Sequence, residues 1–219
     1  MKANKEFLQK HGALIFRIIA CVICWISILI TLISSVITAV NVGNLDNIFR
    51  SLSYYTMQTN YMVLIWITVA LIYTKKEEKP VFLSGIVRGA ITLYISITFL
   101  VFAVALQAFY HPTDPLEISM NILLHYLIPI LFIIDWVITA GEESYKKVYA
   151  LYWLIYPLIY LVYSLIRGLI INWYPYFFID LNRFGALIIL FIAILTLLFY
   201  SLGRVYIFGN QKLYDKKKK

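Results

Sequence analysis

A threonine and a histidine, each set among apolar residues, are the side chains in this sequence best suited to catalysis. Thr56 lies in the segment YYTMQTNY, and His125 lies in the segment NILLHYLIP. A neutral imidazole can accept the proton of a threonine hydroxyl while that oxygen attacks an acyl carbonyl, and it can then protonate the leaving oxygen. The sequence therefore suggests Thr56 as a nucleophile and His125 as its general base.

Polar neighbours accompany both residues at helical spacing. Asn60 lies four residues after Thr56 and Asn121 lies four residues before His125, so each asparagine shares a helical face with its partner. Either amide could donate to an oxyanion, which makes both asparagines candidate substrate-binding residues. Pro129 has no N–H for the carbonyl of His125, so we expect the helix to open at the histidine. The alternative to a catalytic role is that the polar residues of both segments only form hydrogen bonds between membrane helices.

A second polar stripe ends in a permanent cation. Tyr156, Tyr160, Tyr163 and Arg167 follow one another at spacings of four, three and four, so they lie on one face of a helix. A guanidinium can hold a carboxylate through two parallel hydrogen bonds, and Arg167 is therefore a candidate for binding a substrate carboxylate. Its alternative role is to extend toward the lipid headgroups.

The composition indicates an integral membrane protein. Of the 219 residues, 62% are hydrophobic and 14% are charged, whereas soluble domains contain fewer apolar and more charged residues. The net charge of +8 could suggest nucleic acid, but the basic residues form short clusters between apolar runs, as in membrane proteins. We therefore expect no nucleic-acid partner. Cys21 and Cys24 fit neither a zinc site nor an unstrained disulfide, and we expect no metal or cofactor.

Six apolar runs are long enough to cross a bilayer as helices, and short loops join them. We expect an all-α polytopic membrane protein, with residues 1–219 forming a single bundle of six transmembrane helices and residues 209–219 forming a basic tail. The Lys and Arg residues concentrate in the N-terminal segment, two of the loops and this tail, which places both termini in the cytoplasm. The predicted spans are residues 13–40, 52–74, 84–109, 118–138, 148–171 and 184–208.

This topology brings the candidate residues to one depth. Thr56 and Asn60 follow the outer start of the second span, His125 follows that of the fourth, and Arg167 precedes the outer end of the fifth. At the helical rise, all lie on the order of 6–12 Å below the outer ends of their helices. They could form one site. The lysines of the tail could attract anionic lipids, although enforcing the topology is their simpler role.

The order of these features resembles the androgen-induced protein family of intramembrane threonine hydrolases, and most closely its bacterial relatives, the Pr-six-Pr six-span membrane proteins. The resemblance lies in the six short-looped spans, the early threonine of span two, Asn-x-x-x-His followed by proline in span four, and Trp-Tyr-Pro before span six. It implies that Thr56 and His125 hydrolyse fatty acid esters of hydroxy fatty acids. It also implies that Trp173 and Tyr174 form the outer lip of the site.

Several alternatives remain open at this level. Thr59 carries a second hydroxyl one turn after Thr56 and is an alternative nucleophile. An acyl-threonine intermediate could pass its acyl chain to a lipid hydroxyl instead of water, which would make the protein an acyltransferase. The polar cluster could also be the binding site of a small transporter or a lipid-binding protein. The residue usage, rich in Ile, Lys, Asn and Tyr, and the lack of organelle signals favour a bacterial plasma membrane.

Overall fold

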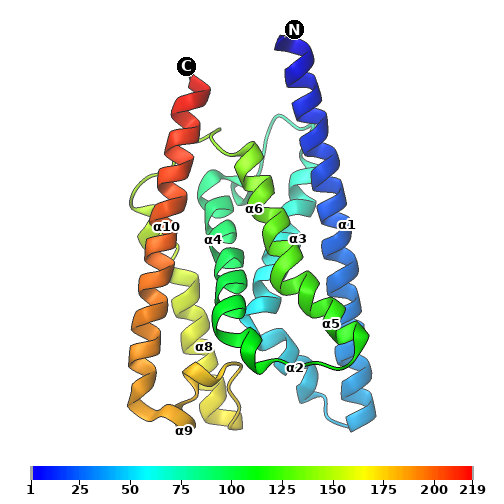
Figure 1. The fold of residues 1–219 in the computed structure, drawn as a ribbon, viewed down its shortest axis with the longest axis vertical. Helices are drawn as coiled ribbons and strands as arrows, with labels where there is room; N and C mark the ends of the chain where they lie inside the picture. Colours follow the sequence, from blue (N-terminus) through cyan, green and yellow to red (C-terminus); the bar gives the residue numbers. More distant parts are fainter. Residues whose placement is uncertain (1, 219) are drawn as a thin grey trace.

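The computed structural model describes residues 2–218, with side chains described from residue 11 onwards. All regular secondary structure in this part of the chain is helical, which confirms the predicted all-α class. Six helical segments are long and apolar enough to cross a membrane, as predicted (Figure 1). These segments are His11–Val42, Tyr55–Ile72, Gly85–Phe109, Pro115–Thr139, Tyr149–Ile171 and Leu181–Lys218.

Short 3₁₀ or π-helical segments interrupt or extend three of the six spans, and a turn divides a fourth. The α-helices are α1 (Lys2–Val42), α2 (Asp46–Ser53), α3 (Tyr55–Ile72), α4 (Gly85–Val101), α5 (Pro115–Ile122), α6 (Ile128–Thr139), α7 (Tyr149–Tyr152), α8 (Ile155–Ile171), α9 (Leu181–Phe184) and α10 (Ile188–Lys218). The 3₁₀ helices are Val81–Leu83, Gln107–Phe109, Phe177–Ile179 and Gly185–Leu187, and the π-helices are Phe102–Leu106 and Leu123–Leu127.

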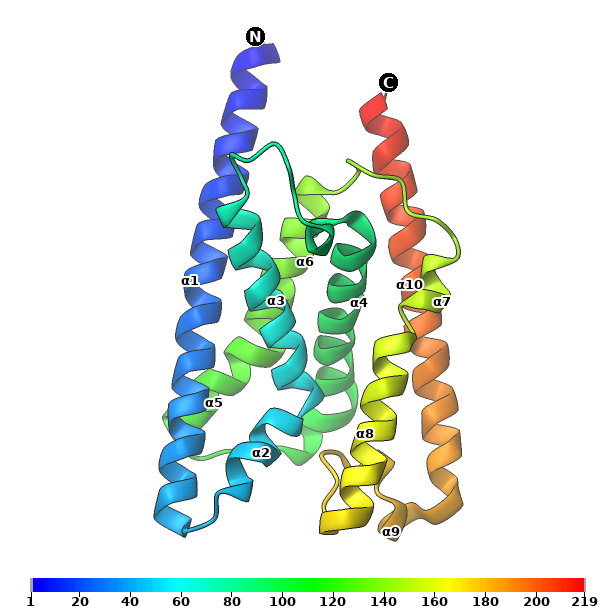
Figure 2. The ribbon, with the colours of Figure 1, turned by 180° about the vertical axis from the view of Figure 1, so that it is seen from behind.

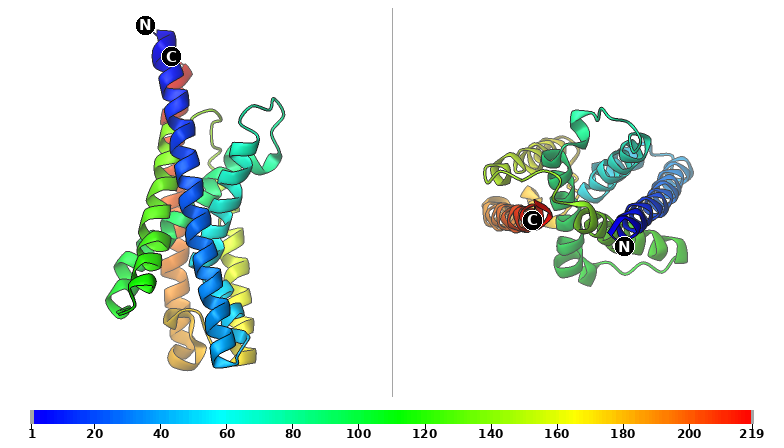
Figure 3. Two further views of the ribbon diagram at one scale, coloured as in Figure 1. Left: turned by 90° about the vertical axis from the view of Figure 1, so that its right-hand side faces the viewer. Right: turned by 90° about the horizontal axis from the view of Figure 1, so that it is seen from above.

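The helices run roughly along the long axis of the molecule. Both ends of the described chain lie at one end of the bundle, which we call the terminal end, whereas α2 and α9 lie at the opposite end (Figures 1 and 2). Viewed from above, α1 and α3 lie on one side and α8 and α10 on the other, with α4 and α6 between them (Figure 3). The arrangement agrees with an even number of membrane crossings.

Helix α4 contributes to both apolar cores of the bundle. Ile91 and Ile95 pack into a core shared with α1, α3 and α6, while Leu93 and Ile97 pack into a second core that includes Trp153 and side chains of α8 and α10. All four α4 side chains are buried. A helix that is buried on opposite faces in this way holds the two halves of the bundle together.

The outward faces of the bundle are apolar. Ile19 on α1, Ile159 on α8 and Leu190 on α10 are each more than half exposed. In water such a continuous apolar surface would be unfavourable, whereas in a bilayer these side chains meet lipid tails. The surface therefore agrees with a multi-pass membrane protein.

The helix boundaries differ from the predicted spans at several places. The predicted second span began at residue 52, but α2 ends at Ser53 and Tyr54 is extended before α3 begins. The predicted fifth span is interrupted between α7 and α8. The basic tail continues α10 as a helix to Lys218, because lysine favours helices and cations stabilise a helix C-terminus.

Two π-helical segments face one another at the opposite end from the termini. One begins at Phe102, and the other contains His125. The aromatic rings of these two residues stack with their centroids 3.7 Å apart. Single π-helical turns within α-helices are uncommon and concentrate at functional sites, so this pair directs attention to His125.

Candidate active site

The structure brings Thr56 and His125 together. Thr56 Oγ1 lies 3.2 Å from His125 Nε2, although the two residues are 69 positions apart in the chain. Thr56 lies in the first turn of α3, and His125 lies in the π-helical segment between α5 and α6. The distance is that of a hydrogen bond between a nucleophile and its base.

The other ring nitrogen of His125 determines how the imidazole is protonated. His125 Nδ1 lies 3.1 Å from the backbone carbonyl oxygen of Asn121. A carbonyl oxygen can only accept a hydrogen bond, so Nδ1 carries the proton and Nε2 presents its lone pair to the Thr56 hydroxyl. The imidazole is therefore oriented as a base. Asn121 contributes this carbonyl through its backbone, and its side-chain oxygen has no hydrogen-bond partner among the described residues.

Asn60 holds the backbone of the site. Its fully buried side-chain amide donates to the carbonyl of Thr56 at 2.7 Å and to that of Leu124 at 3.1 Å. Both amide hydrogens are thus engaged within the protein, so Asn60 positions the two segments and is not free to donate to a substrate. The contact of Asn60 with substrate stays a prediction. The two hydrogen bonds within the protein do not favour it.

The bond from Asn60 to Leu124 has a local cause. In the π-helical segment, the N–H of Ile128 donates to the carbonyl of Leu123, five residues earlier. The same spacing would pair the carbonyl of Leu124 with residue 129, which is a proline and has no N–H. Pro129 therefore frees a carbonyl at this site, as the sequence suggested. The carbonyl that Asn60 reaches is one residue earlier than expected, because the helix has π rather than α spacing.

Thr59 lies on a different hydrogen-bonding path. Its hydroxyl donates to the carbonyl of Thr56 at 3.1 Å and lies 2.8 Å from the hydroxyl of Thr98. Neither contact involves an imidazole. Of the two candidate nucleophiles, Thr56 is therefore the one that contacts His125.

Tyr176 is a member of the site that the sequence did not reveal. Its hydroxyl oxygen accepts a hydrogen bond from the backbone N–H of Thr56 at 3.3 Å and lies 3.5 Å from Thr56 Oγ1. This N–H belongs to the first turn of α3, where no earlier carbonyl is available to it. Burial raises the pKa of Tyr176 to about 12, so the phenol keeps its proton and can donate it. The only feature of the sequence that points to Tyr176 is the density of aromatic residues after Pro175.

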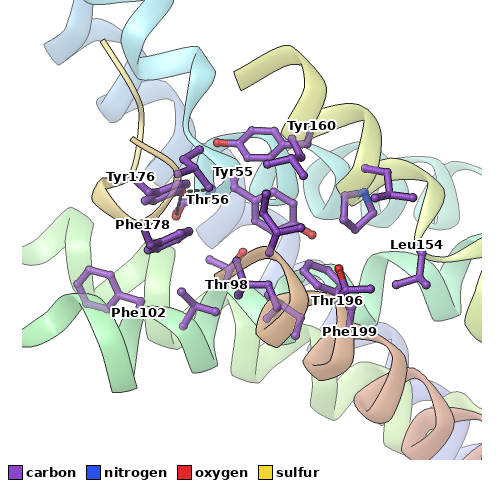
Figure 4. A pocket seen from close by; sticks show the side chains of 18 of the residues that line it. Tyr55, Thr56, Thr98, Phe102, Leu154, Tyr160, Tyr176, Phe178, Thr196 and Phe199 are labelled. Atoms are coloured by element: carbon purple, nitrogen blue, oxygen red, sulfur yellow. Dashed lines mark hydrogen bonds between the residues drawn. The ribbon is translucent and has the colours of Figure 1, made fainter. Parts of the chain in front are cut away.

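An apolar cavity of about 100 Å³ lies beside these groups. Thr56, Phe102 and Tyr176 line it, together with apolar side chains of α4, α8 and α10, and Phe102 is the residue that stacks on His125 (Figure 4). Figure 4 shows Thr56 and Tyr176 side by side at the wall of this cavity. The hydroxyl of Thr56 therefore lies between a base and a space suited to an apolar group.

All five predicted substrate-binding residues lie outside the lining of this cavity: Asn60, Asn121, Arg167, Trp173 and Tyr174. Arg167 donates to Asp46 at 2.8 Å, and its guanidinium lies 5.7 Å from the ring centroid of Trp173. The hydrogen bond from Arg50, and a further one from Arg167, hold the pKa of Asp46 below its usual value. Tyr174 packs against α8, and its buried hydroxyl has no hydrogen-bond partner within residues 2–218.

Trp173 nevertheless connects to the site through aromatic contacts. Its ring centroid lies 5.7 Å from that of Tyr54, which in turn lies 5.8 Å from that of Tyr176. Both contacts are edge-to-face. The loop after α8 thereby fixes the position of Tyr176, whereas the role of Arg167, Trp173 and Tyr174 in binding substrate stays a prediction.

Comparison of the chain with protein-family models, with curated proteins and with solved structures gave no significant match.

Proposed function

We propose that this protein is an intramembrane hydrolase of lipid esters, with Thr56 as the nucleophile and His125 as the general base. The observation that carries the proposal is the 3.2 Å contact between Thr56 Oγ1 and an imidazole nitrogen whose lone pair is directed at it by the Asn121 carbonyl. The order of the motifs, which resembles that of the androgen-induced protein family, agrees with this proposal.

The reaction follows from these positions. His125 Nε2 takes the proton of Thr56 as Oγ1 bonds to the ester carbonyl carbon, and the same proton then passes to the leaving alcohol as its bond to that carbon breaks. Water next attacks the acyl-threonine and gives a proton to His125, which returns it to Thr56 Oγ1 as the fatty acid leaves. Each step returns the imidazole to its neutral form.

Tyr176 is the best-placed donor for the oxyanion. Because its oxygen accepts from the N–H of Thr56, its own hydrogen is available to a negative oxygen that forms next to Thr56. The oxyanion also forms at the N-terminal end of α3, where the helix dipole is positive. Both effects act on charge that develops in the transition state.

The substrate class follows from the cavity and the resemblance. The cavity is lined mainly by apolar and aromatic side chains, which suits a segment of acyl chain. The resemblance suggests fatty acid esters of hydroxy fatty acids, which also carry a free carboxylate. Arg167 would have to exchange Asp46 for that carboxylate, since the two form an ion pair at 2.8 Å.

The positive-inside distribution of Lys and Arg supports cytoplasmic termini. The residue usage and the lack of organelle signals favour a bacterial plasma membrane. Cysteines introduced at Asn44 and Pro112 should then react with an impermeant thiol reagent applied to intact cells, while one at Glu78 should react only after lysis. Labelling of the Glu78 variant in intact cells would reverse the topology and place Thr56 in the inner half of the bilayer.

The enzyme proposal is tested with a fluorophosphonate probe, which reacts with nucleophilic serine and threonine hydroxyls, and with an ester substrate. Thr56→Ala and His125→Ala should each abolish hydrolysis and labelling, because the two groups act in one step. The double variant should be scarcely worse than either single variant, since residues that act as a unit give non-additive losses.

Thr59→Ala is the matched control, because it removes a hydroxyl one turn away that does not contact His125. It should retain most of the activity. If Thr59→Ala abolishes labelling while Thr56→Ala does not, the nucleophile is Thr59. If the wild type does not label and hydrolyses no ester, the cluster is a binding site of a transporter or lipid-binding protein instead.

A further inference from the structure

A second polar cluster lies within the bundle near the terminal end. Asp135 on α6 is fully buried, and it accepts hydrogen bonds from Arg17 Nε at 2.9 Å and from Arg88 at 2.9 Å. Arg17 belongs to α1 and Arg88 to α4, so the cluster joins three spans (Figure 1). Neither arginine contributes to the site around Thr56.

The cluster contains more positive than negative charge. Two guanidinium groups share the single carboxylate of Asp135, and both lie over the ring of Trp66, at 5.4 Å for Arg17 and 5.1 Å for Arg88. Arg88 also donates to Thr139, a neutral acceptor. Its Nε atom is buried and has no hydrogen-bond partner among the described residues. A buried guanidinium that lacks a full set of acceptors is unfavourable unless another anion is bound.

A cavity of about 410 Å³ opens directly onto these guanidinium groups. Arg17 and Arg88 lie in its wall, and Lys79, Lys217 and Glu142 are further charged residues that line it. With the carboxylate of the cluster, four basic side chains face two acidic ones, which leaves a net charge of +2. The lysines come from the loop after α3 and from α10, so cations converge on the cavity from four parts of the chain.

We propose that this cavity binds a phosphoryl group, supplied either by the headgroup of a phosphate-monoester lipid or by free phosphate. A phosphate monoester carries about −1.5 to −2 charges at neutral pH, which matches the net charge of the site. Its oxygens can accept from a guanidinium and from two lysines at once, and its charge would balance the two positive charges that Asp135 and Glu142 leave uncompensated. Lys79 and Lys217 are exposed, whereas the side chains of Arg17 and Arg88 are only 18% and 11% exposed.

This site is independent of the ester chemistry proposed for Thr56. It also differs from a general attraction of the basic tail to lipid, because the partly buried arginines Arg17 and Arg88 would hold a phosphoryl group at one position. Binding can therefore be measured whether or not the protein hydrolyses esters.

The test measures binding by calorimetry to the full-length protein in micelles of a neutral detergent at physiological ionic strength. Three ligands are compared: dioctanoyl phosphatidic acid, dioctanoylglycerol, which has the same chains without the phosphoryl group, and inorganic phosphate. Phosphatidic acid should bind at least tenfold more tightly than dioctanoylglycerol. If inorganic phosphate binds as tightly as phosphatidic acid, the natural ligand is free phosphate, and if it binds much more weakly, the ligand is a lipid.

A pair of matched variants separates a defined site from diffuse charge. Lys79→Ala with Lys217→Ala removes two lysines that line the cavity, and it should weaken phosphatidic acid binding roughly 25-fold, about fivefold for each lysine. Lys75→Ala with Lys216→Ala removes the same charge from exposed neighbours outside the lining, and it should weaken binding no more than about twofold, because salt screens exposed charges. Equal losses in the two double variants, or no preference for the phosphoryl group in the wild type, would overturn the proposal.

Discussion

Replacing Asp135 by asparagine should be one of the most destabilising single substitutions in this protein. The carboxylate accepts from Nε and from a terminal nitrogen of Arg17, at 2.9 and 3.0 Å, and from Arg88 at 2.9 Å. An asparagine keeps the volume but offers one acceptor, and its amide nitrogen would face a guanidinium N–H. Two cations would remain beside each other with no counter-charge.

The magnitude follows from burial. Breaking a buried ion pair by removing one partner costs about 3–5 kcal/mol, because the other charge is left uncompensated. The side chains of Arg17 and Arg88 are 18% and 11% exposed, so some water screens them and the lower value, about 3 kcal/mol, applies. Such a loss lowers the ratio of folded to unfolded protein by roughly 100-fold.

Asp46→Asn is the matched control. Asp46 pairs with Arg50 at 2.7 Å and with Arg167 at 2.8 Å, but its own side chain is 32% exposed, so that substitution should cost clearly less than Asp135→Asn. Unfolding would be followed in mixed micelles through tryptophan fluorescence, to which Trp66 contributes beneath both guanidinium groups of the cluster.

A second variant distinguishes charge from packing. The triple substitution Asp135→Leu, Arg17→Met, Arg88→Met removes all three charges together and should be much closer to wild type than Asp135→Asn, because apolar groups of similar size replace an ion cluster at little cost. If Asp135→Asn costs no more than Asp46→Asn, or if the triple variant is the least stable of the set, the reasoning from uncompensated charge is refuted.

Two further substitutions test the loop after α8. Tyr176→Phe removes the hydroxyl that contacts the N–H of Thr56 and should lower the rate of ester hydrolysis roughly 100-fold while leaving unfolding nearly unchanged; an unaltered rate would exclude Tyr176 as the oxyanion donor. Gly168→Ala places a methyl group inside the ring of Tyr174 and should cost about 1–3 kcal/mol in the unfolding assay, despite the better helix propensity of alanine; a more stable variant would show that the loop moves away without loss.

Much of the fold could be predicted from the sequence because its signals are local. Each span is a continuous apolar run of sufficient length, and the spacing of four residues between Asn121 and His125 puts both on one helical turn. The contact of Thr56 with His125 was a hypothesis based on equal depth in the bilayer and on motif order. The structure gives the distance between the two atoms, 3.2 Å.

The rest could not be predicted because it depends on contacts between distant segments. Tyr176 meets Thr56 across 120 residues, and Arg17 meets Asp135 across 118. Arg167 looked available for a substrate from its place in span five, but its partner Asp46 lies 121 residues away in the first loop region. No periodicity in the sequence carries information about which loop residue will meet which helix.

The membrane explains why the two polar clusters are built differently. Around Thr56, every partner of the His125 imidazole is neutral: a hydroxyl, a backbone carbonyl and an aromatic ring. An aspartate in place of the Asn121 carbonyl would hold the imidazole in the same tautomer. It would also add a buried charge, and removing that charge from water would cost on the order of several kcal/mol. The charged cluster lies instead near the terminal end, beside an open cavity.

The neutral surroundings of His125 affect the proposed reaction. A carboxylate would stabilise the imidazolium that forms when His125 accepts the proton of Thr56, and the Asn121 carbonyl provides only part of that stabilisation. The ring of Phe102, stacked on His125 with a centroid separation of 3.7 Å, provides a second part, because an aromatic face attracts a cation most strongly where water is excluded. Phe102 therefore belongs to the candidate active site on electrostatic as well as steric grounds, and the π-helical segment that begins with it is what brings its face onto the imidazole.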